Sequence, residues 1–100
     1  MNTIVDIDPK HLVRDFRDGK LPETWTWTLN AKKKRRQYEL LGWDVDALDR
    51  ILDGQFDRAW YSRNLDRANV ATGTGLAVGL VVADDGRIMV VSVMEDKGMR

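Results

Sequence analysis

The first third of the chain combines one helical pattern with one alternating pattern of apolar residues. Asp8 can cap a helix that Pro9 begins and that Gly19 ends. The apolar face of this helix consists of Leu12, Val13 and Phe16. The segment from Thr3 to Asp8 is predicted as a strand or an arm. Thr24 to Leu29 alternates strictly with threonine, which predicts a strand with both tryptophans and the leucine on one face.

The stretch from Asn30 to Gly54 is predicted to form two helices that meet at Gly42. Asn30 can cap the first helix, and Asp44 can cap the second. The first helix begins with five consecutive cations, Lys32, Lys33, Lys34, Arg35 and Arg36. Its few apolar contacts are expected from Tyr38, Leu40 and Leu41. The second helix has an apolar stripe of Val45, Leu48, Ile51 and Leu52 opposite the acids Asp46, Asp49 and Asp53.

The C-terminal half is predicted to contain three strands, at residues 56–63, 76–83 and 87–94. Asn64 to Gly75 is predicted as a polar loop between the first two. Asp85 and Gly86 favour a tight hairpin turn between the last two, because this pair readily supplies the positive φ angles that such a turn needs. These last two strands are apolar on both faces and should lie at the centre of the sheet. The charged tail from Glu95 to Arg100 should fray.

Together these elements predict an α+β fold in a single domain spanning residues 1–100. An antiparallel sheet of about four strands should pack against three helices on one side. The residues expected to be buried are Trp25, Val45, Leu48, Ile51, Leu80 and Val91. The basic run from Lys32 to Arg36 should be mostly exposed.

Composition narrows the function classes. A hydrophobic share of 43% and a charged share of 32% in 100 residues are typical of a globular domain rather than a disordered chain. The lack of cysteine excludes a disulfide scaffold, a thiolate zinc site and a cysteine nucleophile. The N-terminal residues lack the features of a signal peptide, and the longest apolar run is far shorter than the ~20 residues of a membrane span. We therefore expect a cytoplasmic protein with no membrane association, no metal site and no cofactor.

The basic run is the first candidate for function. Cations at a helix N-terminus are unfavourable by roughly 0.3–1 kcal/mol each, which suggests another use for them, such as binding RNA phosphates. The alternative is a solvated face neutralised by the acids of the next helix. Those acids fit a solvated face better than a metal site. The tryptophans fit a core better than a base-stacking surface, and the lone His11 fits a helix surface better than a catalytic site.

Three short segments resemble the MqsR toxins, which are ribosome-independent mRNA interferases with a RelE-like fold. They are Leu41 to Asp46 (LGWDVD), Arg58 to Arg63 (RAWYSR) and Val91 to Glu95 (VSVME), and they occur in the family's order. The resemblance implies a RelE-like fold, metal-independent RNA cleavage and a cognate antitoxin as partner.

The resemblance also implies a catalytic group of Tyr61, Arg63, Arg87 and Lys97. The chain departs from the family at Ser62 and Met94, where the family has lysines. Arginine stabilises a phosphorane but hardly deprotonates, so the acid–base work would fall to Tyr61, His11 or Lys97.

Two functions therefore stay open. The first is an endoribonuclease toxin that cleaves mRNA and is held inactive by an antitoxin. The second is a catalytically inactive binding protein on the same fold, such as a phage-encoded inhibitor of a host nucleic-acid-processing complex. A DNA mimic built on the acids of Asp44 to Asp57 is opposed by the cations one helix away and by the zero net charge.

Overall fold

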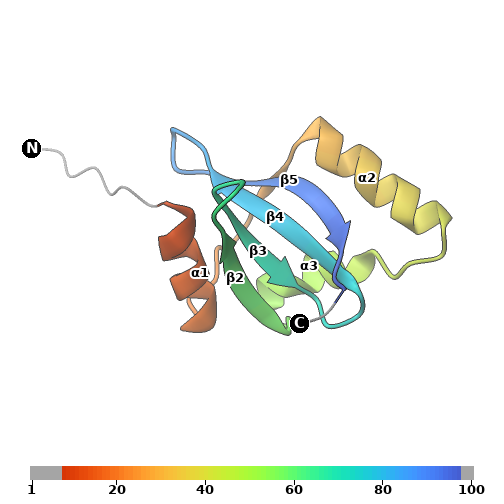
Figure 1. The fold of residues 1–100 in the computed structure, drawn as a ribbon, viewed down its shortest axis with the longest axis horizontal. Coiled ribbons are helices and arrows are strands. Elements are labelled where there is room, and N and C mark those ends of the chain that lie inside the picture. Colours follow the sequence, from red (N-terminus) through yellow and green to blue (C-terminus); the bar gives the residue numbers. More distant parts are fainter. Residues whose placement is uncertain (1–7, 98–100) are drawn as a thin grey trace, which may run out of the picture.

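A computed structural model describes residues 8–97 of the chain (Figure 1). Its helices are α1 (Pro9–Arg17), α2 (Leu29–Leu40), α3 (Asp46–Arg50) and the single 3-10 turn η1 (Ile51–Asp53). Its strands are β1 (Thr26–Trp27), β2 (Arg58–Ser62), β3 (Arg67–Ala71), β4 (Leu76–Val82) and β5 (Ile88–Glu95). The strand or arm expected before Asp8, and the last three residues of the tail, lie outside the described residues. No helix within residues 8–97 is long and apolar enough to cross a membrane.

The strands form one sheet in the order β1-β5-β4-β3-β2. β2 to β5 are antiparallel neighbours, whereas β1 runs parallel to β5. The fold is thus α+β with three helices, as predicted, but the sheet has five strands and is mixed. In Figure 1, α3 lies behind the sheet, with α1 and α2 at its two sides.

Helix α1 forms where the sequence predicted it. The Asp8 carboxylate accepts a hydrogen bond of 2.9 Å from the backbone N–H of His11, and Pro9 occupies the first turn. Gly19 follows the helix with a φ of 78°, a conformation that favours glycine. The predicted apolar face is buried, and Phe16 packs edge-on against Phe56 at 5.6 Å between ring centroids.

The boundary between β1 and α2 differs from the prediction. The strand ends at Trp27 because the Thr28 hydroxyl caps α2, accepting a 3.2 Å hydrogen bond from the Ala31 backbone N–H. The helix therefore begins at Leu29, which is 69% exposed instead of sharing a buried face with the tryptophans. The Asn30 cap was a wrong prediction, because a threonine two residues earlier provides the cap.

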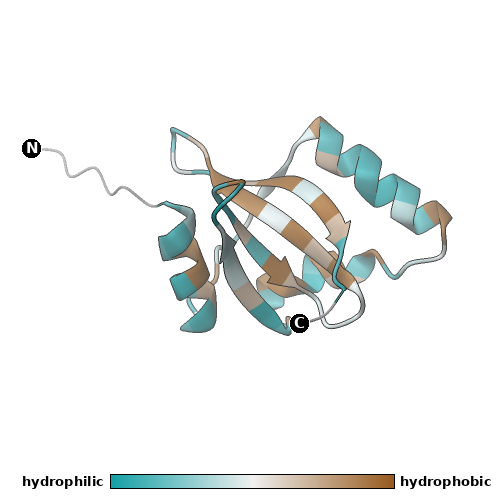
Figure 2. Ribbon diagram, in the orientation of Figure 1, coloured by the Kyte–Doolittle hydropathy of each residue, from teal (hydrophilic) through white to brown (hydrophobic). Residues whose placement is uncertain are grey.

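The C-terminal end of α2 was also predicted wrongly. Leu40 and Leu41 are 72% and 74% exposed, so they are not its contacts with the sheet. Ala31 is buried instead, and Tyr38 packs edge-on against Trp43 at 5.7 Å. In Figure 2, α2 is hydrophilic over most of its length.

Helix α3 begins at Asp46 and continues through η1. Val45, Leu48 and Ile51 are buried as predicted, and Leu52 is half-buried. Val45 is the residue directly before the helix and provides no side-chain cap, whereas the Asp44 carboxylate interacts with the backbone amides of Asp46 and Ala47, as a capping residue does. The pKa of Asp44 is lowered mainly because its carboxylate accepts a 2.8 Å hydrogen bond from Arg50. The positive charge of Arg50 and the backbone amides of the first turn lower it further.

Strand β3 lies where a polar loop was predicted between Asn64 and Gly75. Its sequence, RANVA, has small residues and no clear alternation of large apolar and polar side chains. It nevertheless pairs with β2 on one side and β4 on the other, and its last four residues are buried. The prediction of a loop was wrong because pairing on both edges, rather than residue propensity, fixes this segment as a strand. Asp84 to Gly86 does form the predicted turn between β4 and β5.

The two faces of the sheet differ in cover. The face toward the helices holds two buried or half-buried rows across the strands, Ala59-Val70-Val78-Val93 and Tyr61-Ala68-Leu80-Val90. The opposite face, called the open face below, holds the rows Arg58-Ala71-Ala77-Met94 and Trp60-Asn69-Gly79-Ser92. Val91 was expected to be buried but is half-exposed, because a register shift between Gly79 and Leu80 leaves it without a partner on β4. The other predicted core residues are buried.

Candidate nucleic-acid interface

The basic run lies on α2, and four of its five cations face solvent. Lys32, Lys33 and Lys34 are exposed, and no ion pair within residues 8–97 engages them. Arg36 is also exposed and lies 3.5 Å from Glu39 in a marginal ion pair. The prediction of a mostly exposed run is confirmed. Helix α2 thus presents charge that the acids of residues 8–97 leave largely unneutralised.

Arg35 is the exception within the run. Its guanidinium donates two hydrogen bonds of 2.9 Å to the Asp49 carboxylate and lies 3.5 Å from Asp46. It also lies over the Trp27 ring, 5.0 Å from its centroid. The bonds to Asp49 raise the pKa of Arg35. Arg35 therefore joins α2 to α3 and β1. Within residues 8–97, it is the one cation of the basic run that the acids of α3 neutralise, as the alternative interpretation of this run expected.

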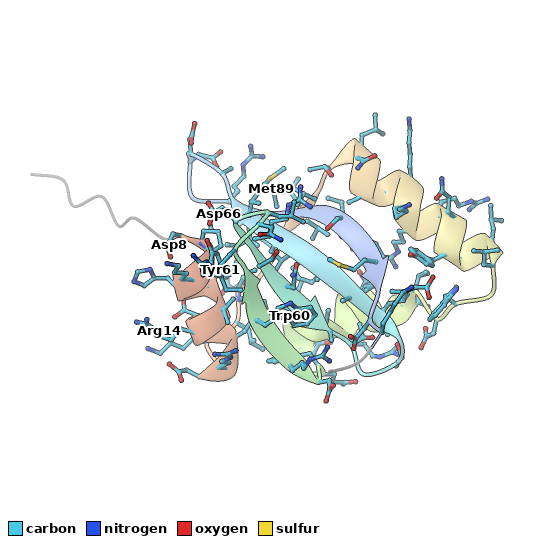
Figure 3. All side chains as sticks on the ribbon, viewed as in Figure 1. Asp8, Arg14, Trp60, Tyr61, Asp66 and Met89 are labelled. Atoms are coloured by element: carbon cyan, nitrogen blue, oxygen red, sulfur yellow. The ribbon has the colours of Figure 1, made fainter. Side chains whose placement is uncertain are left out.

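Tyr61 lies near the end of β2, at the side of the sheet next to α1 (Figure 3). Its hydroxyl donates a 2.6 Å hydrogen bond to Asp66, and Lys10 Nζ lies 5.3 Å from its ring centroid. The hydrogen bond to Asp66 is the main cause that raises the pKa of Tyr61, and the negative charge of Asp8 adds to it. At neutral pH, this tyrosine is a neutral hydrogen-bond donor.

Arg63 adds a cation beside Tyr61, and His11 lies beside Asp8 on α1. Arg63 follows it in the β2–β3 turn and is exposed, and its positive charge partly offsets the rise in the pKa of Tyr61. The His11 ring lies 2.9 Å from the Asp8 carboxylate through Nδ1. We call Asp8, Lys10, His11, Tyr61, Arg63 and Asp66 the α1 cluster. It combines a carboxylate-bound imidazole, a neutral phenol and two cations at the surface.

The other two predicted catalytic residues lie outside the α1 cluster. Arg87 lies in the β4–β5 turn, where its Nε donates a 2.7 Å hydrogen bond to Asp85. Lys97 follows β5 at the opposite end of the sheet from Tyr61, since Glu95 pairs with Leu76 and Tyr61 pairs with Ala68. The structure therefore places Lys97 away from Tyr61 and Arg63, whereas Arg87 lies in the hairpin turn at their end of the sheet and is paired with Asp85.

A groove of about 800 Å³ lies at the Lys97 end of the sheet. Arg58 and Asp96 form a bidentate pair on its wall, with N–O distances of 2.9 and 2.7 Å. The Arg58 guanidinium also lies 4.6 Å from the Trp60 ring centroid. This pair fixes Trp60 on the open face.

Several of these residues were missed by sequence reasoning. Lys10 and Asp66 gave no signal, because only the tertiary fold brings them to Tyr61. Asn69 on the open face was assigned to a loop, so its position in the sheet was not foreseen. No group of three or more potential metal ligands occurs among residues 8–97.

Comparisons with known protein families, with curated proteins and with solved structures found no match to this chain.

Proposed function

We propose that the protein binds RNA through the exposed cations of α2 and cleaves it without a metal ion, as the toxin of a toxin–antitoxin pair. The observation that supports binding is the exposure of Lys32, Lys33 and Lys34 without ion pairs within residues 8–97. Cations of this kind bind phosphates and release counterions, which favours association with nucleic acid. The resemblance of three segments to MqsR toxins supports RNA as the substrate.

The α1 cluster supports the cleavage step. In such a reaction the RNA 2′-oxygen attacks the phosphorus, and the bond from phosphorus to the 5′-oxygen breaks. A base must take the 2′ proton, an acid must protonate the leaving oxygen, and cations must stabilise the phosphorane. His11 is suited to the proton transfers, Tyr61 to hydrogen bonding as a neutral donor, and Arg63 to the developing charge. Asp66 would have to give up the Tyr61 hydroxyl when RNA binds. Arg87 and Lys97 would contact RNA elsewhere along its backbone.

The second candidate function is a catalytically inactive binding protein. It is favoured by the engagement of Tyr61 with Asp66 and of Arg87 with Asp85, and by the distance of Lys97 from both. In this case the cations of α2 would bind a nucleic acid or an acidic protein complex without chemistry.

The test is cleavage and binding of a labelled single-stranded RNA in the presence of EDTA. The variants are Tyr61→Phe, Arg63→Ala and His11→Ala, with the triple change of Lys32, Lys33 and Lys34 to Gln. We expect the first three to lose cleavage while keeping RNA affinity. We expect the triple variant to bind less tightly and to reduce the slope of log affinity against log salt by about 2, since each contact to a single strand contributes ~0.7. Lys20→Gln, at an exposed lysine in the turn after α1, is the matched control.

Growth of cells expressing each variant gives an independent readout. A toxin arrests growth in the wild type and loses this effect in the cleavage variants. RNA binding without cleavage or growth arrest favours the second candidate. An RNA affinity that is undetectable, or unchanged in the triple variant, overturns the proposed binding mode.

A further inference from the structure

A row of four residues crosses the centre of the open face. Trp60 on β2 pairs with Asn69 on β3, Asn69 pairs with Gly79 on β4, and Gly79 pairs with Ser92 on β5. The side chains of this row therefore project from the same face of four adjacent strands. No part of the α1 cluster belongs to it.

Two polar atoms in this row are buried without a partner. Asn69 is only 6% exposed, and its Oδ1 accepts no hydrogen bond from any described residue. The Ser92 hydroxyl is likewise buried and unpartnered. Buried polar groups of this kind are uncommon, because each loses its hydrogen bonds to water without gaining a replacement. Their retention side by side indicates a use other than stability.

Both atoms lie at Gly79. The Ser92 hydroxyl occupies space that a Cβ at Gly79 would need, and Asn69 Oδ1 lies 3.3 Å from that Cβ position. Only glycine leaves room for them here. The Cδ atom of Arg67 lies 3.5 Å from the same position, so its side-chain stem covers the two polar atoms. A flexible arginine stem can swing aside when a ligand arrives.

Arg67 and Trp60 flank the covered polar atoms. Arg67 is half-exposed, and its guanidinium has no hydrogen bond or ion pair with another described residue. Trp60 is half-exposed on β2, and its ring packs against the Arg58 guanidinium, which is hydrogen-bonded to Asp96. The row thus places an aromatic ring, an amide and a hydroxyl on one face of the sheet, and the side-chain stem of Arg67 lies beside Gly79 at its centre.

We propose that this row binds one nucleobase of a single-stranded RNA, an inference that rests on the proposed RNA-binding function. Trp60 stacks on the base, since every base offers a π face to an aromatic ring. The amide of Asn69 provides a donor and an acceptor to the edge of the base, and Ser92 adds a third hydrogen bond. Arg67 moves from above Gly79 to the adjoining phosphate. The row therefore supplies base preference, whereas α2 supplies affinity that does not depend on sequence.

The experiment measures fluorescence anisotropy of labelled A8, C8, G8 and U8 RNA with the wild type, Asn69→Leu and Ser92→Ala. The wild type should prefer one of the four octamers. Asn69→Leu should weaken binding of that octamer by roughly 10-fold and bring it level with the others, because a bidentate contact to a base edge is lost. Ser92→Ala should weaken it by a smaller factor. Asn64→Leu, at an exposed asparagine in the β2–β3 turn, is the matched control and should keep the preference.

The outcomes separate this inference from the proposed function. If the four octamers bind with the same ratios in the wild type and in both variants, the base site is wrong and RNA binding through α2 stands. If the wild type binds none of them, both proposals fall. The triple lysine variant should weaken all four equally, which distinguishes the two contributions. Should Asn69→Leu fail to fold by circular dichroism, Ser92→Ala decides, because it removes one oxygen atom only.

Discussion

Replacing Gly79 by alanine tests the packing at the centre of the open face. Gly79 lies in the central strand β4, and its φ is outside the left-handed region, so alanine can adopt the same backbone conformation. The added methyl group would meet the Ser92 hydroxyl, whose oxygen occupies its space, and would lie 3.3 Å from Asn69 Oδ1. The effect of the substitution therefore depends on Ser92.

Two opposing contributions set the magnitude. Overpacking a close-packed site costs about 1–3 kcal/mol, whereas Gly→Ala at a permitted backbone position gains about 0.4–1 kcal/mol by restricting the unfolded chain. We expect Gly79→Ala to lower the free energy of unfolding by about 0.5–2 kcal/mol in the wild type. Ser92→Ala alone should raise it by about 1 kcal/mol, because it removes an unpartnered buried hydroxyl.

The double variant gives the decisive comparison. Once Ser92 is alanine, the clash is relieved, and Gly79→Ala should stabilise the protein by about 0.4–1 kcal/mol. The coupling free energy between the two sites should then be about 1–3 kcal/mol.

The assay is urea denaturation of the four proteins, followed by tryptophan fluorescence and circular dichroism, with the slope m compared across them. Ser62→Ala is the matched control, since Ser62 does not face Gly79 across the strands, and its effect should add to that of Gly79→Ala. Additivity of Gly79→Ala and Ser92→Ala within about 0.5 kcal/mol would refute the packing deduced here and weaken the base site.

Three further predictions concern charged groups. Hydrogen bonds to His11 lower the pKa of the Asp8 carboxylate from the ordinary 3.8, so its contribution to stability is present above pH 3.8 and is lost as the pH falls through the lowered value. Asp8→Asn should keep the cap and remove this pH dependence, and Asp8→Ala should lower the midpoint of thermal unfolding at neutral pH. The hydrogen bond to Asp66 raises the pKa of Tyr61 above 10.0, so its contribution to the free energy of unfolding is present below pH 10 and is lost as the pH rises through the raised value. Ultraviolet titration of Asp66→Asn should show one tyrosine ionising at lower pH than in the wild type. Asp96→Asn breaks the bidentate pair with Arg58 and should lower the midpoint of urea unfolding, whereas Asp53→Asn, at an exposed acid, should leave that midpoint unchanged.

The candidate site was only partly accessible from sequence. The exposure of the basic run followed from its composition, because lysines on a helix with few apolar neighbours have no core to enter. The pairing of Arg35 with Asp49 could not be predicted in this way, since the two residues meet only when α2 and α3 pack together. In the same way, Tyr61 and Arg63 were found from a local pattern, whereas Asp66 and Lys10 reach Tyr61 through the β2–β3 turn and α1.

Local chemistry decided the elements that the sequence predicts well. Asp8, Pro9 and Gly19 bound α1 because caps and turns act within a few residues, and Asp85 with Gly86 fixed the last hairpin for the same reason. The basic run and the apolar stripe of α3 are likewise local patterns that can be identified from the sequence alone. Tertiary pairing decided the rest. β3 is a strand because β2 and β4 supply partners for its backbone on both edges, and β1 joins the sheet only because β5 lies beside it. The row from Trp60 to Ser92 exists only in that assembled sheet, since its four members come from four strands that no local pattern aligns.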